Sequence, residues 1–257
     1  MPLSISQREK IEKLLHNVMS KKIKKYERET KSMPFLSRLI QDEVLVASYS
    51  FIHSWSTSLG MSIYEQLAEM IVEGNTEAIR QLRIKEGIDE KRITEIRRII
   101  NELKNGRQPD KIQESTEVLN IPNSNPQKIH NKGSIVDFYM KREGKEYYFE
   151  IKTVKPNTGE VWIAKQKLLE WVARKNVLLN SIVALPYNPD PSKEYQRFTS
   201  NNIFDKKELW VAEQFWDFLG GPGTYEQLLE IFDKVGKNFK VELQKKIKDI
   251  SKDISKV

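Results

Sequence analysis

Apolar residues recur every three or four positions over the first part of the chain. They predict an amphipathic helix over residues 7–25, opened by a capping box of Ser6 and Glu9. Pro34 suits a first helical position, and the apolar stretch 35–55 predicts a second, largely buried helix. The N-terminal part of the protein is therefore expected to be mainly helical.

Two glycines punctuate the pattern that follows. Gly60 is expected to separate the second helix from a third helix over residues 63–73, which ends at Gly74. Ser62 and Glu65 have the spacing of a capping box at the start of this third helix. The capping box gives Glu65 a purely structural role, which has to be weighed against any chemical role.

Strands are expected only in the second half of the chain. A fourth helix is predicted over 89–104, and most of 105–132, with its three prolines, is expected to form a loop. Two β-rich runs, a helix and another apolar strand follow, over residues 135–141, 146–154, 162–174 and 177–185. A short helix is predicted over 225–235, and an apolar helical stripe follows residue 239. The pattern predicts an α/β protein with a small sheet flanked by helices.

Composition narrows the class of protein. The 257 residues are 39% hydrophobic, enough to bury a sizeable core, and we expect one elaborated domain over 1–257. Without cysteine the chain has no disulfides, thiolate metal sites or cysteine nucleophile. No apolar run approaches a membrane span, and the first residues lead into a charged helix rather than a signal peptide. We expect a soluble protein without a membrane partner, in the cytoplasm.

Charge gives a first indication of a partner. Lysine and arginine number 43 against 36 acidic residues, which gives a formal net charge of +7. Such an excess suits a polyanion, because each neutralised phosphate releases counterions. Composition alone leaves nucleic acid and no specific partner about equally open.

The stretch "VDFYMKREGKEYYFEIK", residues 136–152, carries the candidate chemistry. A two-residue turn at 143–144 would set Asp137 directly opposite Glu150, with Lys152 on the same face. Two opposed carboxylates repel one another unless a cation lies between them. Mg²⁺ prefers carboxylate oxygens, water and substrate phosphate, and can activate a bound water. The hairpin thus predicts a metal-dependent phosphodiesterase, with Lys152 orienting the attacking water.

A simpler interpretation of the hairpin stays open. Charged residues make up 31% of the chain, so an acid opposite a Glu-x-Lys pair is also typical of a solvated edge hairpin. Lys152 would then only neutralise Glu150. The turn sequence is also not of the favoured Asn-Gly or Asp-Gly type.

Asp137 followed by "EIK" at 150–152 resembles the PD-(D/E)xK nucleases, with Val136 in the place of the proline. The blocks "PFLSRLIQDEVLVASYSFIHSWSTSLGMSIYEQLAEMI", "KGSIVDFYMK", "YYFEIKTVKPN", "LPYNPDP" and "FWDFLGGPGTYEQLLEIF" resemble, in this order, the TdeIII/MjaII-type restriction endonucleases. These blocks extend from about residue 34 to 235. The resemblance implies a restriction-endonuclease-like core and a type II enzyme that cuts both strands of a short palindromic DNA site. This family is associated with GGNCC.

The resemblance also implies cofactor, partners and site residues. The cofactor would be Mg²⁺, for which Mn²⁺ can substitute, and the partners double-stranded DNA and a second copy of the chain. Asp137, Glu150 and the backbone carbonyl of Ile151 would hold the metal, and Lys152 would position the water. Glu65 is the candidate acid from the first core helix, with Glu69 one turn further on in reserve.

Four further residues are candidate DNA contacts, although each is equally compatible with a polar surface. Lys132, Lys155 and Gln166 are placed to reach phosphates around the hairpin and the following helix. Arg197, in a polar segment, is a candidate reader of guanine. The dimer contacts would come from the C-terminal stripe or the N-terminal helices, either of which could instead pack within the monomer.

The resulting division of the chain has three parts. Residues 1–104 would be the mainly helical part, 133–185 the catalytic core and 186–257 the part for DNA recognition and dimerisation. Two alternatives remain: a structure-directed repair or resolvase-type nuclease with the same core, and a non-catalytic DNA-binding protein that keeps the fold.

Overall fold

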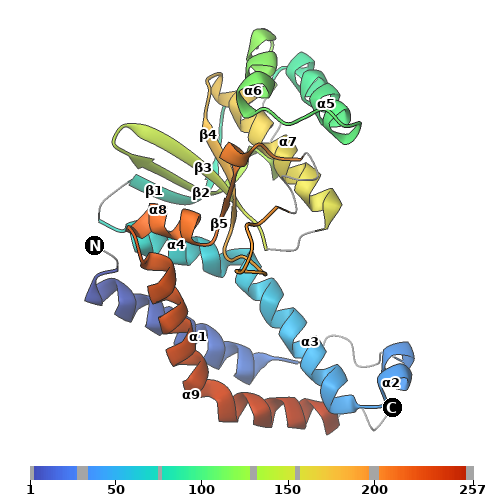
Figure 1. Ribbon diagram of the computed structural model, residues 1–257, viewed down its shortest axis with the longest axis vertical. Helices are drawn as coiled ribbons and strands as arrows, with labels where there is room; N and C mark the ends of the chain where they lie inside the picture. The colour runs from blue at the N-terminus through green and yellow to red at the C-terminus, as the bar shows by residue number, and fades with distance from the viewer. Residues whose placement is uncertain are drawn as a thin grey trace.

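A five-stranded mixed sheet forms the centre of the protein (Figure 1). The computed structural model describes residues 3–27, 34–74, 77–127, 132–153, 157–196 and 203–252. The strands lie in the order β1-β2-β3-β4-β5, with bounds Glu77–Arg83, Ile135–Arg142, Lys145–Ile151, Asn180–Leu185 and Leu209–Val211. The first three are antiparallel, whereas β3, β4 and β5 are parallel. The predicted α/β class with a small mixed sheet is confirmed.

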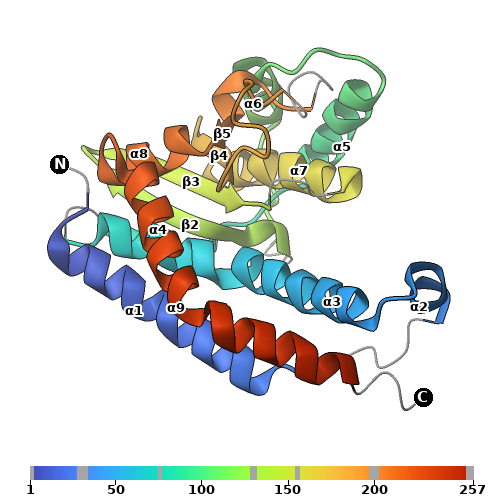
Figure 2. The same cartoon turned by 60° about the horizontal axis from the view of Figure 1, so that its bottom comes forward.

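Helices cover both faces of this sheet. Their bounds are α1 Ile5–Lys25, α2 Pro34–Ile40, α3 Glu43–Ser58, α4 Tyr64–Val72, α5 Glu90–Lys104, α6 Lys111–Asn120, α7 Thr158–Lys175, α8 Glu213–Gly220 and α9 Thr224–Lys252. One face packs against α4, α8, α9 and α1, and the other against α7, with α5 and α6 outside it. Helices α1, α3 and α9 extend together beyond the sheet (Figure 2).

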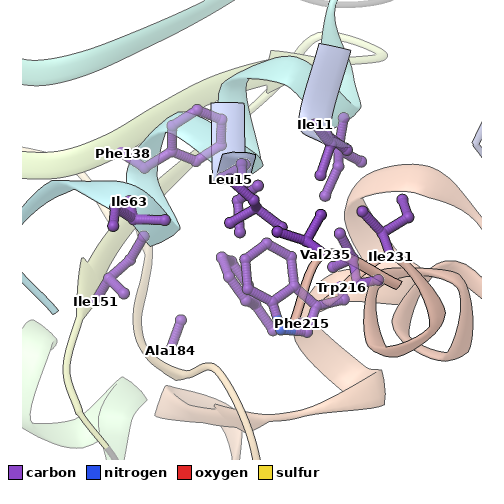
Figure 3. Packing of buried hydrophobic residues seen from close by; sticks show 14 of the residues in the cluster. Ile11, Leu15, Ile63, Phe138, Ile151, Ala184, Phe215, Trp216, Ile231 and Val235 are labelled. Carbon is purple, nitrogen blue, oxygen red and sulfur yellow. The ribbon is translucent and has the colours of Figure 1, made fainter. Parts of the chain in front are cut away.

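The largest core lies between the sheet and the helices that begin and end the chain. Ile11 and Leu15 of α1, Phe138 of β2, Trp216 of α8 and Val235 of α9 converge there (Figure 3). Each of these side chains is buried, so each contributes on the order of 1.5–3 kcal/mol of hydrophobic stabilisation. Helices α1, α8 and α9 thereby hold α4 against the sheet.

The strands β2 and β3 pair in the predicted register. The pairs run from Arg142 opposite Lys145, beside the turn, to Phe138 opposite Phe149. The two turn residues, 143–144, have φ angles of 51° and 76°. Two successive positive φ angles match the right-handed twist of a hairpin, so this turn forms despite its unusual sequence.

The predicted single buried helix over 35–55 is wrong. Gln41 adopts a φ of 55° and ends α2, and Asp42 then caps α3 by accepting a hydrogen bond from the Leu45 amide at 3.0 Å. Phe35 and Leu39 on α2 are 85% and 83% exposed. The apolar stretch predicts burial, but one face of it is open to solvent.

The predicted break between the second and third helices is also wrong. Helix α3 continues into α4 through a π-helical turn, Leu59–Ile63, and no side chain caps α4. The predicted capping box of Ser62 and Glu65 therefore does not form. Gly60 has a different reason to be glycine, because a Cβ there would lie 2.6 Å from Thr153 Cγ2.

Three elements differ from the expected pattern elsewhere. Strand β1 lies where no strand was expected, and helix α6 lies in the segment that was expected to be mostly loop. The short helix and the following stripe expected near the C-terminus form one continuous helix, α9. The capping box of α1 is formed by Ser4 and Gln7, two residues before the predicted one. Over the described ranges, no helix combines the length and apolar character needed to cross a membrane.

Candidate active site

The candidate site lies where β2 and β3 stop pairing. The last backbone pair of the two strands is Phe138 opposite Phe149. Beyond it, the Asp137 side chain makes the contact between the strands, because its Oδ2 accepts a hydrogen bond from the Ile151 amide at 2.9 Å. On the other side, the Lys152 amide donates to the Ala184 carbonyl at 3.0 Å. The β2 carboxylate is thus held against the last residues of β3.

Glu150 is the most buried acid of the site, at 1% exposure. Its Oε1 lies 2.6 Å from Lys152 Nζ, and its Oε2 accepts from Lys167 Nζ. Lys167 Nζ also lies 4.0 Å from Asp137 Oδ1. The ammonium groups of Lys152 and Lys167 therefore compensate the charges of two adjacent carboxylates. Lys167 lies near both carboxylates.

Helix α7 brings Lys167 to the hairpin. Asn157 caps this helix by accepting a hydrogen bond from the Glu160 amide at 2.9 Å. Ala164, Leu168 and Trp171 bury the same side of α7 against the sheet. Residue 167 lies three positions after Ala164 and four before Trp171, so its side chain is directed toward the strand ends.

Glu65 approaches the same place from the other side of the sheet. The Glu65 side chain is buried, and its Oε1 accepts a hydrogen bond from Gln81 Nε2 at 2.8 Å. Gln81 itself has a positive φ of 52° within β1. Burial raises the pKa of Glu65, and the negative charge of Glu150 raises it further. The hydrogen bond from Gln81 and the positive charge of Lys167 lower this pKa, but they do not cancel the rise. The charges of Glu150 and Lys167 thus both act on the pKa of Glu65.

The electrostatics of the pair at the strand ends are unusual. Burial, reinforced by repulsion from Glu150, raises the pKa of Asp137 to about 7, although Lys167 and Lys152 act in the opposite direction. Burial alone would lower the pKa of Lys152, but Glu150 and Asp137 outweigh it and raise that pKa. Lys152 is consequently an ammonium at neutral pH, while Asp137 is readily protonated.

Other sequence candidates lie elsewhere or have other partners. Glu69, the reserve acid, is half-buried and pairs with Arg80 at 2.7 Å. Gln166 donates from Nε2 to Glu170 Oε1 at 2.8 Å, on its own helix. Lys132 begins a short 3₁₀ turn, and its side chain is outside the described part.

Two predicted DNA contacts, Lys155 and Arg197, lie outside the described residues. Lys165, which directly precedes Gln166 on α7, has a structural environment. It is fully buried and lies 2.5 Å from both Glu114 and Glu208. That triad is therefore separate from the chemistry at the strand ends.

Lys167 lies at the site, whereas the sequence predicts its neighbour Gln166 there. The available signal was its helical spacing from Ala164 and Trp171, which sets residue 167, rather than 166, toward the sheet. Gln81 had no such signal, because β1 itself was not expected.

The donor atoms at the strand ends suit a hard divalent cation. Asp137, Glu150 and the Ile151 carbonyl offer only oxygen, the ligand type that Mg²⁺ prefers. Across the described ranges, no three acidic or histidine side chains form a ready-made metal cluster. The Lys167 ammonium nevertheless marks a position beside both carboxylates that accepts a cation.

Comparison with known proteins agrees with the resemblance of the sequence blocks. A family model described as "Type II restriction endonuclease, HinfI" matches residues 3–236. The chain is 31% identical to the type II restriction enzyme MjaII of Methanocaldococcus jannaschii over 205 residues, 73% of this chain and 54% of that enzyme. It therefore aligns with only about half the length of MjaII.

Two relatives from Herpetosiphon aurantiacus align over more of their length. The type II restriction enzymes HgiEI and HgiCII are 27% and 30% identical to the chain, over 231 and 232 residues. Each alignment covers 83% of this chain and 81% of the relative. No solved structure matches the chain. With a family model covering most of its length, the chain belongs to the HinfI family of type II restriction endonucleases.

Proposed function

We propose that the protein is a site-specific deoxyribonuclease that hydrolyses phosphodiester bonds in both strands of a short palindromic DNA site. The observation that carries this proposal is the convergence of Asp137, Glu150 and Lys152 at the open end of β2 and β3, in a chain of this family. The resemblance of the sequence blocks suggests GGNCC as the site.

The proposed cofactor is Mg²⁺, with Mn²⁺ as a substitute. Asp137, Glu150 and the backbone carbonyl of Ile151 would hold the ion. Once bound, it would polarise the scissile phosphodiester and lower the pKa of a water molecule.

Lys152 acts as a fixed positive charge in this proposal. Its pKa is raised, so it keeps its proton at neutral pH and serves as a hydrogen-bond donor rather than a base. From this position it orients the attacking water and stabilises charge that develops on the phosphate.

Lys167 and the cofactor compete for the same oxygens. The Lys167 ammonium contacts Glu150 Oε2, and two cations at one carboxylate oxygen repel one another. We therefore place Lys167 Nζ away from Glu150 when the ion is held, in a position to contact a DNA phosphate.

The remaining residues have supporting roles in the proposal. Glu65, oriented by Gln81, adds negative charge that favours the ion or its water ligands. Lys132, Lys155 and Gln166 are proposed phosphate contacts, and Arg197 a reader of guanine. The chain from 1 to 257 is proposed as one endonuclease domain that works as a homodimer on a two-fold site.

Digestion of phage DNA tests the function directly. Purified protein with Mg²⁺ is expected to give discrete fragments, whose mapped ends define the site. A smear, or a preference for branched DNA, would indicate a structure-directed nuclease. Metal-independent binding without any cleavage would indicate a DNA-binding protein that only keeps the fold.

A further inference from the structure

Helix α3 presents an exposed face without charge. Residues 44–64 contain no Asp, Glu, Lys or Arg, although such residues make up 31% of the chain. Val44, Leu45, Tyr49 and Ile52 on α3 are nevertheless exposed. Surface helices normally carry charged residues on the solvent side, so an uncharged exposed face is typical of an interface.

Helix α2 extends the same character. Phe35 and Leu39 lie four residues apart on one side of α2 and are more than four-fifths exposed. Seven residues are too few for a helix that is stable in isolation, so α2 depends on packing for its stability. Phe35 and Leu39 contribute little packing within this chain.

The opposite side of α3 is already occupied. Val46, Ala47 and Phe51 are buried. Ser54 accepts a hydrogen bond from Lys22 of α1, and Ser50 shares one with Tyr26, directly after α1. Of the fifteen large apolar side chains exposed among the described residues, six lie within residues 35–52. These six define the α2–α3 face: Phe35, Leu39, Val44, Leu45, Tyr49 and Ile52.

The size of the α2–α3 face suits a protein partner. At about 200 Å² for a fully exposed large side chain, the six expose on the order of 700 Å², close to the roughly 800 Å² per partner of a standard interface. DNA is a poor occupant, because α3 has no lysine or arginine and α2 has one, Arg38. A second copy of a chain with net charge +7 approaches most easily through an uncharged face.

The alternative apolar surface is used within the chain. The C-terminal stripe was a candidate dimer contact, but Phe239 and Ile250 of α9 are buried in the core that α1 and α3 share. His16 of α1 packs against the ring of Phe239 at 4.7 Å between centroids. Over the described part of α9, this stripe is therefore largely used within the chain.

We propose that two copies of the protein pair through the α2–α3 face in an isologous, two-fold interface. The choice of a second copy as occupant rests on the proposed function, since cutting both strands of a two-fold site takes two centres. The same six residues from each copy would then bury one another.

Sedimentation of the full chain, without DNA or divalent metal, tests this pairing. The wild type is expected at twice its chain mass of 30.2 kDa, and Leu39→Glu and Tyr49→Glu at the single mass. Val241→Glu is the matched control, because Val241 is exposed on α9 outside the face, and it should stay paired. A monomeric wild type, or variants that still pair, would overturn the proposal.

A second readout is independent of how the charged variants fold. The chain has no cysteine, so single substitutions Leu45→Cys, Tyr49→Cys and Ile52→Cys introduce the only thiol. A bifunctional maleimide long enough to span the face should link at least one of them into a covalent dimer, and Val241→Cys should remain unlinked. Failure of all three to link overturns the pairing.

These measurements separate the two proposals. A chain that pairs through this face but does not cut DNA contradicts the nuclease proposal alone. A chain that cuts DNA at a defined site but never pairs through the face contradicts the interface alone.

Discussion

Lys167, on the helix that follows the hairpin, donates from Nζ to Oε2 of Glu150 at the end of β3. The same nitrogen lies 4.0 Å from Asp137 Oδ1. Two neighbouring carboxylates repel one another, and this ammonium offsets part of their repulsion. The site is therefore held together by charges that a divalent ion would have to rearrange.

Lys167→Met is expected to tighten metal binding. Without the competing ammonium, the Mg²⁺ concentration that gives half of the maximal thermal stabilisation should fall by about tenfold, equivalent to about 1.4 kcal/mol. In the absence of metal the variant should be less stable than the wild type, because Glu150 remains buried with one partner fewer. Thermal unfolding across a Mg²⁺ titration measures both effects.

Gln166→Met is the matched control for this substitution. Gln166 precedes Lys167 on α7 and donates to Glu170 rather than to the site. The Gln166→Met variant should need the same Mg²⁺ concentration as the wild type for half of the maximal thermal stabilisation. An unchanged metal requirement in Lys167→Met would contradict the competition between the ammonium and the ion.

Asp137→Asn is expected to stabilise the protein at alkaline pH. The Asp137 pKa rises from 3.8 to about 7 on folding, so the folded state binds a proton that the unfolded chain releases in this interval. Wild-type stability due to this group therefore falls as pH rises from about 4 to 7 and then levels off. Asparagine keeps an oxygen for the Ile151 amide and carries no charge.

The pH profile of unfolding checks the sign of this effect. Above pH 7 the Asp137→Asn variant should be more stable than the wild type by on the order of 1–3 kcal/mol. Near pH 4 the difference should vanish, since Asp137 is then protonated in the folded protein. An Asp137→Asn variant less stable than the wild type at pH 8 would show that the charged Asp137 carboxylate is not destabilised by its surroundings.

Gly60→Ala is expected to destabilise the contact between the π-helical turn and the end of β3. The new Cβ would lie 2.6 Å from Thr153 Cγ2, which is closer than packed atoms allow. A cost of about 1–3 kcal/mol is typical of such overpacking. Thr153→Ser removes the clashing methyl group, so the double variant should regain most of the loss. Equal losses in the single and double variants would place the strain elsewhere.

The hairpin could be predicted from sequence because its determinants are local. A two-residue turn fixes the register, and alternation along each strand sets Asp137, Glu150 and Lys152 on one side. The structure has this register as far as Phe138 opposite Phe149. The small mixed sheet could likewise be expected from the order of strands and helix.

Features that depend on distant parts of the chain could not be predicted in this way. Strand β1 has alternating burial but a charged sequence, and its pairing with β2 makes it a strand. The contact of Gln81 with Glu65 follows from that pairing. Ser62 and Glu65 have ideal capping spacing, yet the helix continues through them because a π-helical turn leaves no free helix start.

The exposed apolar helices illustrate a different limit. Hydrophobicity along α2 and α3 indicated burial, but it cannot specify whether the covering surface belongs to the same chain. Phe35 and Leu39 are exposed in the single chain. The sequence therefore predicts the apolar character of α2 and α3 correctly. Its prediction that these apolar residues are largely buried is wrong for the exposed face.

The most direct measurement is Mg²⁺-dependent cleavage of phage DNA by wild-type, Asp137→Ala and Glu150→Ala proteins. Glu146→Ala is the control, because this acid lies on the same strand but accepts from the hydroxyls of Tyr139 and Tyr148. The wild type and the control should yield the same discrete fragments. Both site variants should bind DNA, remain folded by circular dichroism and lose cleavage by at least about 1,000-fold. Fragments produced by either site variant at close to the wild-type rate would contradict the assignment of the active site.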